Sequence, residues 1–592
     1  MPRQNIPLVV HVTHEAGVKL GGIGAVLDGF LSSPEYNASV ARSILAGPIN
    51  PFDTVQMERL FSTENRLHVR YSSLYGYEWN EGPEPVVSAL QAIERAMNVK
   101  FLYGTRTIGG RDHEILLVDA GGIDGNTINS FKFYLWQRWG LSCSQFQDNW
   151  EFSFFLNAGE PIFAGLQAIT QNMAPGVARY LIAHEWLGLP VVFSAKLRDD
   201  SLYRTIFYAH EVATARLLVE ENGGHDTRFY NALRLGRFQG NSLDQVFGDH
   251  SWFYKHAMLL RAGVCDRIFA VGDPTFEELR FLGGVFSTAP IDLVFNGIPA
   301  ASTSLEEKLV SRDLLLQYAE NLYGYRPDYV FSHVTRMVPS KALWRDVKVL
   351  EHLEWTLASR GKRAVLFIVS TASPTGRRAE DVSRWETEYG WPVEHRSDNG
   401  DLLQDEVHFF HHVLEPFHWG RQAIRICLIN QFGWERARCG NRMPEAMRFS
   451  HLRAGVDLEF GQSIYEPFGI AQVEPLSSGA LCVPSSICGC MGFVNRANGG
   501  VVPRNVIVGD YVYIPPEWHL WSAWDALRID QAVRDAIEAR ESWEVAQRIA
   551  ERLPLDDEDR RRLLQEGQRV ARGMSWDVVV NDYFLPALIR TR

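Results

Sequence analysis

The chain has 592 residues, too many for one hydrophobic core and enough for two large domains or three ordinary ones, which excludes a small binding module. Hydrophobic residues make up 46% and charged residues 22%, close to the average of globular proteins, which excludes a disordered or fibrous chain. Acidic residues number 71 and basic residues 59, and the resulting net charge of −12 argues against a surface built to bind nucleic acid or anionic lipid.

Neither a disulfide framework nor a zinc module is predicted, because the seven cysteines are odd in number, scattered and without a Cys-x-x-Cys spacing. This pattern favours a reducing compartment. Residues 6–12 have the β-branched composition of a strand rather than that of a leader, and no later stretch has the roughly 18 unbroken apolar residues of a membrane span. We therefore expect a cytoplasmic protein without membrane contact.

Short apolar runs alternate with helical patterns along the chain, which predicts βα units, parallel sheets and the α/β class. The expected strands cover residues 7–12, 115–118, 180–184, 205–208, 267–271, 293–295, 329–334, 364–370 and 456–460. Between them, apolar residues recur every three to four positions, as in residues 343–357, where Gly361 follows at a place that favours glycine after a helix.

The polar, helix-forming stretch 305–323 interrupts this alternation, and Pro327 then leads into a new strand. We place the domain boundary here, with a first domain at residues 1–320 and a second at 321–572. Residues 373–421, rich in charge, His and Trp, are interpreted as an insertion in the second domain. The tail is expected to form two helices, one that follows the acidic cluster 556–559 and ends at Gly573, and one capped by Ser575.

A glycine-rich loop, Lys19-Leu20-Gly21-Gly22-Ile23-Gly24, follows the first expected strand and precedes an apolar helix. Glycines let backbone N–H groups come close to a ligand, the amino end of a helix favours an anion, and Lys19 adds a positive charge. One interpretation is a phosphate site. The other is a tight strand-to-helix turn whose glycines serve packing only.

Two cations five residues apart, Arg336 and Lys341, follow the first expected strand of the second domain. Arg can bind two phosphate oxygens while Lys supplies a compact charge, so the pair suits the neutralisation of a diphosphate leaving group. Ordinary solvated surface charge is the alternative interpretation.

Two carboxylates eight residues apart, Glu466 and Glu474, follow the expected strand at 456–460, and Pro-Phe-Gly stands directly after the first. A helix at this junction directs its amino end at the carboxyl edge of the sheet, where α/β proteins bind ligands. Carboxylates accept hydrogen bonds from sugar or ribose hydroxyls. A helix cap plus a surface glutamate is the weaker alternative, because Pro-Phe-Gly restricts the backbone.

In this order, the three motifs resemble the retaining glycosyltransferases of the GT-B fold, specifically the glycogen and starch synthases. The resemblance covers nearly the whole chain apart from residues 373–421. Further matching segments are His11-Val12-Thr13-His14-Glu15, Asp148-Asn149-Trp150, Ala183-His184-Glu185-Trp186, Phe207-Tyr208-Ala209-His210, Asn296-Gly297-Ile298 and Ser575-Trp576. The resemblance implies two Rossmann-like domains with parallel sheets facing a central cleft, the first on the acceptor side, and a helix at residues 573–592 that packs back on the first domain.

The resemblance also implies roles for residues of the first domain. Lys19 and the loop glycines Gly21 and Gly22 would contact the donor's phosphates and the reacting sugar. His210 would face that sugar. On sequence context alone, His210 is a satisfied core histidine at a strand end, so its assignment depends on the resemblance.

In the second domain, Arg336 and Lys341 would neutralise the departing nucleotide diphosphate. Glu466 would hold the hydroxyls of the transferred sugar, and Glu474 would hold the ribose. The donor-binding glycines implied for this domain are Gly469 and Gly492. The two halves of the site would thus lie on separate domains, so closure would be needed to assemble it.

The implied activity is transfer of glucose, with retention, from ADP-glucose or UDP-glucose to the non-reducing end of an α-1,4-glucan, with no cofactor or metal. The alternatives are a small acceptor, as in sucrose- and trehalose-forming relatives, and a catalytically silent glycan-binding relative, against which the intact charged residues argue. The expected partners are a nucleotide sugar and a saccharide, not nucleic acid or a membrane, and a homo-oligomer is left open.

Two features limit these assignments. Ala25 stands where bacterial glycogen synthases have an acidic residue, and Cys488-Gly489-Cys490-Met491-Gly492-Phe493 replaces their Thr-Gly-Gly loop, closer to the fungal and animal enzymes. The choice between ADP and UDP therefore stays open.

No metal site is predicted from the clustered histidines His408, His411, His412 and His418, because no cysteine accompanies them.

Overall fold

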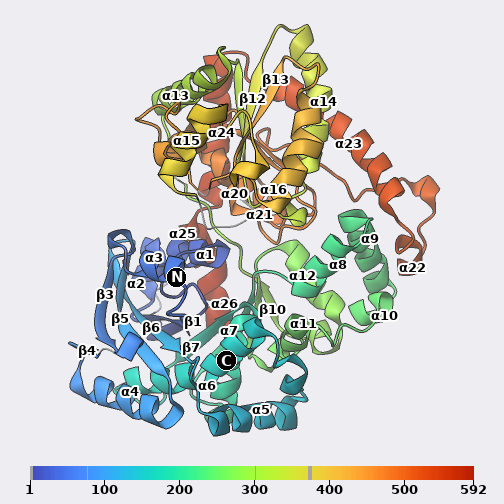
Figure 1. The fold of residues 1–592 in the computed structure, drawn as a ribbon. Coiled ribbons are helices and arrows are strands. Elements are labelled where there is room, and N and C mark those ends of the chain that lie inside the picture. The colour runs from blue at the N-terminus through green and yellow to red at the C-terminus, as the bar shows by residue number, and fades with distance from the viewer. Residues whose placement is uncertain (1–4, 77, 301, 371–376, 432, 592) are drawn as a thin grey trace. The chain divides into compact units, whose positions relative to one another are not determined.

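The computed structural model describes residues 5–76, 78–300, 302–370, 377–431 and 433–591. The chain divides into two compact units, and neither is one continuous stretch of sequence (Figure 1). The first unit consists of Met1–Thr214, Asn241–Gly297 and Trp576–Arg592, and the second of Ala215–Gly240 and Ile298–Ser575. The chain therefore passes from one unit to the other four times.

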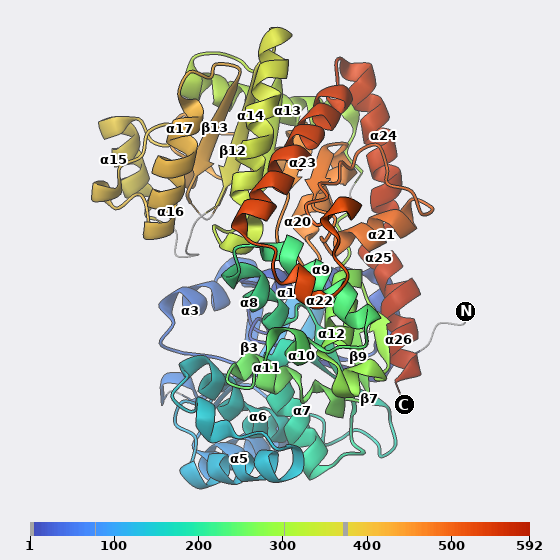
Figure 2. The same ribbon diagram turned by 90° about the vertical axis from the view of Figure 1, so that its right-hand side faces the viewer.

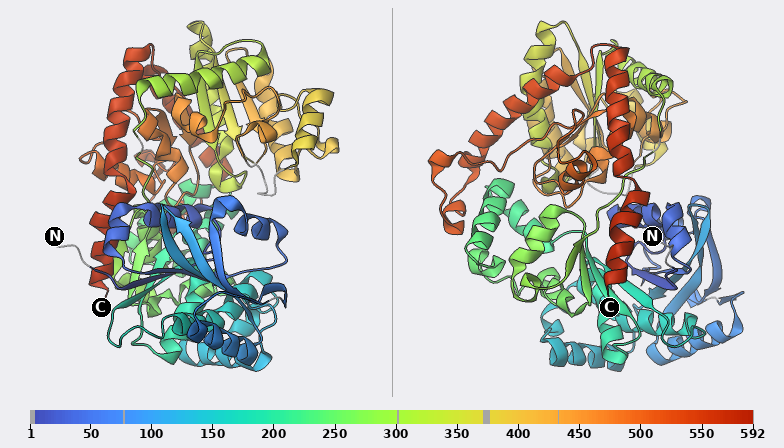
Figure 3. Two further views of the ribbon diagram at one scale, coloured as in Figure 1. Left: turned by 90° about the vertical axis from the view of Figure 1, so that its left-hand side faces the viewer. Right: turned by 180° about the vertical axis from the view of Figure 1, so that it is seen from behind.

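A ten-stranded sheet forms the centre of the first unit (Figure 3). Its strands are β1 (Leu8–Val12), β2 (Ser43–Pro48), β3 (Leu67–Ser72), β4 (Trp79–Asn80), β5 (Lys100–Ile108), β6 (Arg111–Asp119), β7 (Arg179–His184), β8 (Arg204–Ala209), β9 (Arg267–Ala270) and β10 (Ile291–Leu293). The order is β10-β9-β8-β7-β1-β2-β6-β5-β3-β4, parallel from β10 to β6 and antiparallel from β6 to β4. β1 and β7 are buried along their whole length, as their largely apolar sequences suggest for central parallel strands.

Helices connect these strands, and the last segment of the chain also belongs to this unit. The helices are α1 (Gly22–Ser32), α2 (Pro34–Ser39), α3 (Thr54–Leu60), α4 (Glu84–Met97), α5 (Gly125–Trp139), α6 (Trp150–Ile169), α7 (Glu185–Arg198), α10 (Leu243–Phe247), α11 (Tyr254–Leu259), α12 (Asp273–Leu282), α25 (Trp576–Val578) and α26 (Leu585–Arg590). Aromatic packing holds the last segment, because the ring centroids of Trp576 and Phe584 lie 5.1 and 4.7 Å from that of Phe30.

Five parallel strands form the sheet of the second unit: β11 (Tyr329–Val334), β12 (Ala364–Val369), β13 (Ile424–Ile429), β14 (Leu458–Gly461) and β15 (Leu481–Pro484). Their order is β13-β12-β11-β14-β15, so the winding direction reverses between β11 and β14, as in doubly wound sheets. Along β12, Leu366 and Ile368 face one hydrophobic core, whereas Val365 and Phe367 face another. Helices therefore cover both faces of this sheet (Figure 1).

The helices of the second unit include α14 and α23, which pack against each other (Figure 2). They are α9 (His225–Phe238), α13 (Leu305–Tyr323), α14 (Leu343–Ser359), α15 (Ala379–Tyr389), α16 (Gln404–Phe409), α17 (Glu415–His418), α18 (Arg436–Cys439), α19 (Phe449–Gly455), α20 (Ile470–Val473), α21 (Cys490–Ala497), α22 (Ala523–Ala526), α23 (Gln531–Arg552) and α24 (Asp557–Gly573). α8 (Ala213–Glu221) spans the first passage between the units.

The segment predicted as an insertion contributes to both cores of the second unit. Trp385 and Trp391 are buried in one core, and Phe410 and Phe417 in the other. Residues 373–376 of this segment lie outside the described residues.

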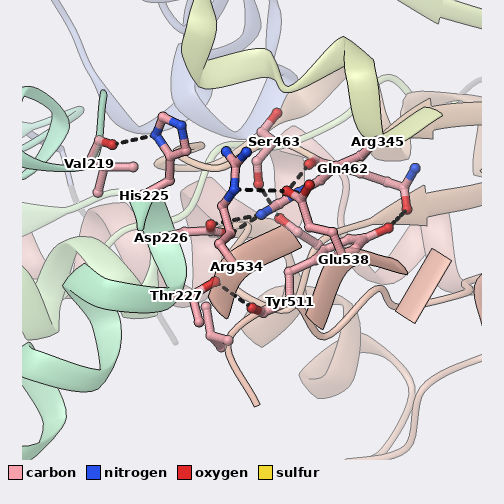
Figure 4. Close-up of polar contacts among 12 residues, drawn as sticks. Val219, His225, Asp226, Thr227, Arg345, Gln462, Ser463, Tyr511, Arg534 and Glu538 are labelled. Atoms are coloured by element: carbon pink, nitrogen blue, oxygen red, sulfur yellow. Dashed lines mark hydrogen bonds and ion pairs between the residues drawn. The ribbon is translucent and has the colours of Figure 1, made fainter. Parts of the chain in front are cut away.

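A buried cluster of charges attaches α9 to the rest of the second unit (Figure 4). Arg345 of α14 donates to both carboxylate oxygens of Asp226 on α9, at 2.9 and 2.7 Å, and to Glu538 of α23 at 2.8 Å. The three side chains are completely buried, and the guanidinium lies 4.0 Å from the ring centroid of Tyr511. The cluster therefore joins three segments that lie far apart in the sequence.

The α/β prediction is confirmed, and every expected strand overlaps an observed one, while β2, β3, β4, β5, β13 and β15 were not expected. The helices expected in the tail correspond to α24 and α25. Within the described ranges, no helix combines the length and apolar character needed to cross a bilayer.

Candidate functional site

The polar residues predicted in the second domain gather where the winding of the five-stranded sheet reverses. The loop after β11 carries Arg336 and Lys341, and the loop after β14 carries Glu466. The carbonyl of Ser340 accepts hydrogen bonds from the backbone N–H groups of Ile464 and Tyr465, at 2.9 and 3.3 Å, which ties the two loops together. Doubly wound sheets bind ligands at this reversal, outside the carboxyl ends of the strands.

Lys341 and Glu466 form an ion pair at this place. Lys341 Nζ donates to Glu466 Oε2, and Gln472 Nε2 donates to the same oxygen at 2.8 Å. The exposed fractions of the lysine and glutamate side chains are 16% and 11%, so both are mostly buried yet accessible from solvent. A cation and a carboxylate held side by side can neutralise a phosphate and accept hydrogen bonds from hydroxyl groups.

The backbone beside Glu466 requires glycine. Gly469 has a φ of +87°, and an added Cβ would lie 2.6 Å from Gln472 Oε1, 2.8 Å from Cys488 Sγ and 2.9 Å from Glu466 Cγ. Gly489 donates its N–H to the carbonyl of Glu466 at 2.9 Å, which joins this loop to the segment that starts α21. Gly469 therefore has a structural reason to be glycine, in addition to its predicted role in donor binding.

The other residues predicted in this domain lie nearby in the chain but have different surroundings. Arg336 is exposed, and its side chain has no hydrogen bond or ion pair to any described residue. Glu474 forms an ion pair with Arg453 at 3.2 Å and is 28% exposed, and Arg453 also pairs with the buried Glu459 at 3.2 Å. Gly492 lies half-buried in α21.

In the first unit, the side chain of Glu15 holds the glycine-rich loop, a role that its place in the sequence did not indicate. The buried carboxylate of Glu15 accepts hydrogen bonds from the backbone N–H groups of Leu20, at 2.7 Å, and Gly21. An added Cβ on Gly22 would meet nothing within 4 Å, so this position borders open space. Lys19 is half-exposed, and its Nζ lies 3.4 Å from Asp28 Oδ2.

His210 lies at the carboxyl end of β8 and is partly exposed. Its backbone N–H and that of Glu211 donate to the carboxylate of Glu185, the latter at 2.7 Å. Glu185 has a φ of +64°, unusual for a residue other than glycine, and burial raises the pKa of its carboxyl group to about 8. Burial lowers the pKa of His210 to about 3, so the ring is neutral near pH 7.

Buried partners of the candidate residues could not be assigned from the sequence. Gln472 of α20, Arg453 of α19 and Glu185 at the start of α7 contact them only because the fold places these helices beside the candidate residues. Gln472 lies between Glu466 and Glu474, and Glu185 lies in the Ala183–Trp186 segment, so only their positions in the sequence hinted at a role. Across the described ranges, no three His, Cys, Asp or Glu side chains gather as a metal site would need.

Comparisons with known proteins support the fold. No protein-family model and no curated protein matches the sequence. The catalytic domain of starch synthase IV from Arabidopsis thaliana, solved bound to ADP and acarbose, matches with a TM-score of 0.52 at 14% identity, over 99% of this chain and 99% of that chain.

Two other solved structures match less well. An α,α-trehalose-phosphate synthase (UDP-forming) from Burkholderia xenovorans has a TM-score of 0.49 at 11% identity, over 100% of this chain and 99% of that one. A sucrose-phosphate synthase from Thermosynechococcus elongatus has a TM-score of 0.47 at 11% identity, over 99% and 98%. The match to starch synthase IV and the two sheets rich in parallel strands show that the chain has the GT-B fold.

Proposed function

We propose that the protein is a retaining glucosyltransferase that moves glucose from ADP-glucose or UDP-glucose to the non-reducing end of an α-1,4-glucan. The observation that carries the proposal is the Lys341–Glu466 pair at the reversal point of the second sheet, with Arg336 on the same loop as Lys341. The shared fold with starch synthase IV, whose structure holds ADP and acarbose, supports this class of ligands.

In the proposed reaction, the bond between the sugar's anomeric carbon and the diphosphate oxygen breaks, and an acceptor hydroxyl forms the new bond on the same face. The acceptor's proton goes to the departing phosphate oxygen. Arg336 and Lys341 neutralise the negative charge that develops on the diphosphate, a contribution of roughly 3–4 kcal/mol per well-placed group. The rest of the catalysis is positioning.

Glu466 holds hydroxyls of the transferred glucose in this proposal, and Glu474 holds the ribose. Lys341 donates to Glu466 in the structure. Donor binding therefore has to break this ion pair, so that Lys341 can contact phosphate and Glu466 can contact sugar. Lys19, Gly21 and Gly22 contribute to phosphate and sugar binding, and His210 faces the reacting sugar. No cofactor or metal takes part, and the seven free, buried cysteines support a reducing, cytoplasmic location.

The test is release of nucleoside diphosphate from ADP-glucose and from UDP-glucose, each with glycogen, with maltose and without acceptor. We expect release that depends on glucan, together with a lengthened chain. Release with a small acceptor only would replace the proposal by a sucrose- or trehalose-type transfer. No release despite donor binding would identify a silent relative.

A further inference from the structure

Three imidazole rings and one phenol lie in line inside the first unit. His210 Nε2 is 2.8 Å from His184 Nδ1, His184 Nε2 is 2.9 Å from His11 Nδ1, and His11 Nε2 is 3.0 Å from the hydroxyl of Tyr36. The Tyr36 hydroxyl is in turn 3.1 Å from Ser43 Oγ. We call His210, His184, His11 and Tyr36 the histidine chain.

The order of the strands produces this alignment. β7 lies between β1 and β8, so His11 on β1, His184 at the end of β7 and His210 just after β8 follow one another across the sheet. His11, His184 and Tyr36 are completely buried. Polar groups in such a place are costly unless they are hydrogen-bonded, and here every ring nitrogen of His11 and His184 has a partner.

The rings of the histidine chain are neutral. Burial lowers the pKa of His11 to about 3 and that of His184 well below its ordinary value. A neutral imidazole has one N–H group and one bare nitrogen, so each interior ring donates on one side and accepts on the other. All hydrogen bonds of the histidine chain must therefore be donated in the same direction. Whether the Tyr36 hydroxyl donates or accepts thus determines which nitrogen of His210 carries the proton.

Ser43, at the end opposite His210, determines the direction in which the hydrogen bonds are donated. If the hydrogen bonds were donated in the direction from His210 to Ser43, Tyr36 would donate to Ser43 Oγ. The Ser43 hydroxyl has no other partner among the described residues, so it would then be a buried donor without an acceptor. In the opposite direction, Ser43 donates to Tyr36, Tyr36 donates to His11, and each ring donates from Nδ1 to the next. Every buried proton then has an acceptor, and His210 carries its proton on Nδ1.

We propose that the histidine chain holds His210 as the Nδ1–H tautomer, so that the ring presents a hydrogen-bond donor to its ligand. His184, His11 and Tyr36 are then positioning residues that act through His210. The identity of the ligand, the reacting sugar, rests on the proposed function. The Nδ1 atom of His210 is available for it, because no described residue hydrogen-bonds to that atom.

The test is NMR spectroscopy of the full-length, ligand-free protein with ring-¹⁵N-labelled histidine, in which His210→Gln assigns the His210 signals. We expect Nδ1 to be protonated in the wild type. Tyr36→Phe removes the donor that sets the direction, so the proton should then distribute over both nitrogens. Tyr208→Phe is the matched control, because the Tyr208 ring centroid lies 4.3 Å from that of His210 but its hydroxyl donates to the carbonyl of Val294 at 2.7 Å, outside the chain.

Protonation of His210 on Nε2 in the wild type, or an unchanged Nδ1–H tautomer in Tyr36→Phe, would overturn the proposal. With active enzyme, Tyr36→Phe should lower kcat by about tenfold and leave the KM for the nucleotide sugar within about twofold, since the ring stays in place. The expected tautomers in a protein without transferase activity would support the chain while refuting the proposed function.

Discussion

The cations of an ion pair and of a buried charge cluster in the second unit, Lys341 and Arg345, lie only four residues apart in the sequence, yet their surroundings differ. Lys341 and Glu466 retain exposed fractions of 16% and 11%, whereas Arg345, Asp226 and Glu538 are 0% exposed. When solvent can reach an ion pair, each side chain can exchange its contact with the other for a contact with a ligand. A completely buried cluster cannot, because separating its charges leaves them without water or counter-charge. Oppositely charged side chains are therefore free to exchange partners in one place and hold distant segments together in the other.

The largest expected effect comes from the buried cluster. Arg345→Ala leaves two buried carboxylates without their shared cation, so the free energy of unfolding of the second unit should fall by roughly 3–5 kcal/mol in chemical denaturation. Lys348→Ala is the control, because Lys348 also pairs with Glu538, at 2.8 Å, but its side chain is 33% exposed, and its loss should cost at most about 1 kcal/mol. Equal losses in the two variants would contradict the distinction between a completely buried cation and a partly exposed one.

Lys341→Ala should mainly lower activity rather than stability. Loss of the cation should lower kcat by about a thousandfold while the unfolding midpoint changes less than in Arg345→Ala, because solvent can still reach Glu466. Lys362→Ala removes an exposed lysine of the same unit that pairs with Asp328 at 2.8 Å, and its activity should equal that of the wild type. Near-normal turnover in Lys341→Ala would refute the leaving-group assignment.

A smaller effect is expected from pH, because buried histidines stay neutral in the folded chain. The unfolded chain binds protons at His11 and His184 below their ordinary pKa of 6.5, whereas burial lowers the pKa of His11 to about 3 and holds that of His184 well below its ordinary value. Stability of the first unit should therefore fall as the pH falls from 6.5 toward 3, by up to about 1.4 kcal/mol per pH unit for each ring.

The measurement is the unfolding free energy at several pH values between 7 and 4. His11→Asn should reduce the pH slope by about one proton, and substitution of the exposed His68 on β3 serves as the comparison. A wild-type slope that His11→Asn does not change would show that His11 binds a proton in the folded chain.

The sequence was sufficient for the class of fold and for the loops that carry Lys341 and Glu466, because long buried strands and the residues directly after them leave local patterns. It did not predict β15 or β13, and β13 follows the segment interpreted as an insertion. The antiparallel strands β3 to β5 were not predicted either, because these strands form only by pairing with their neighbours.

Contacts between distant residues were beyond the reach of one sequence. Nothing local to Asp226 indicates that its segment joins the second unit, because Arg345 lies 119 residues away. The alignment of His11, His184 and His210 likewise depends on the order of β1, β7 and β8 in the sheet. Whether the site residues contact a nucleotide sugar stays a prediction.

The cluster around Arg345 also has a consequence for biosynthesis. Asp226 leaves the ribosome 119 residues before Arg345, and Glu538 follows Arg345 by a further 193 residues. At ordinary elongation rates the nascent chain waits roughly 10–40 s between Arg345 and its last carboxylate. The first unit waits longer still for Phe584, which packs on Phe30. Neither unit can complete its interior until Glu538 and Phe584 have been synthesised, so both units stay incomplete while most of residues 1–592 are made.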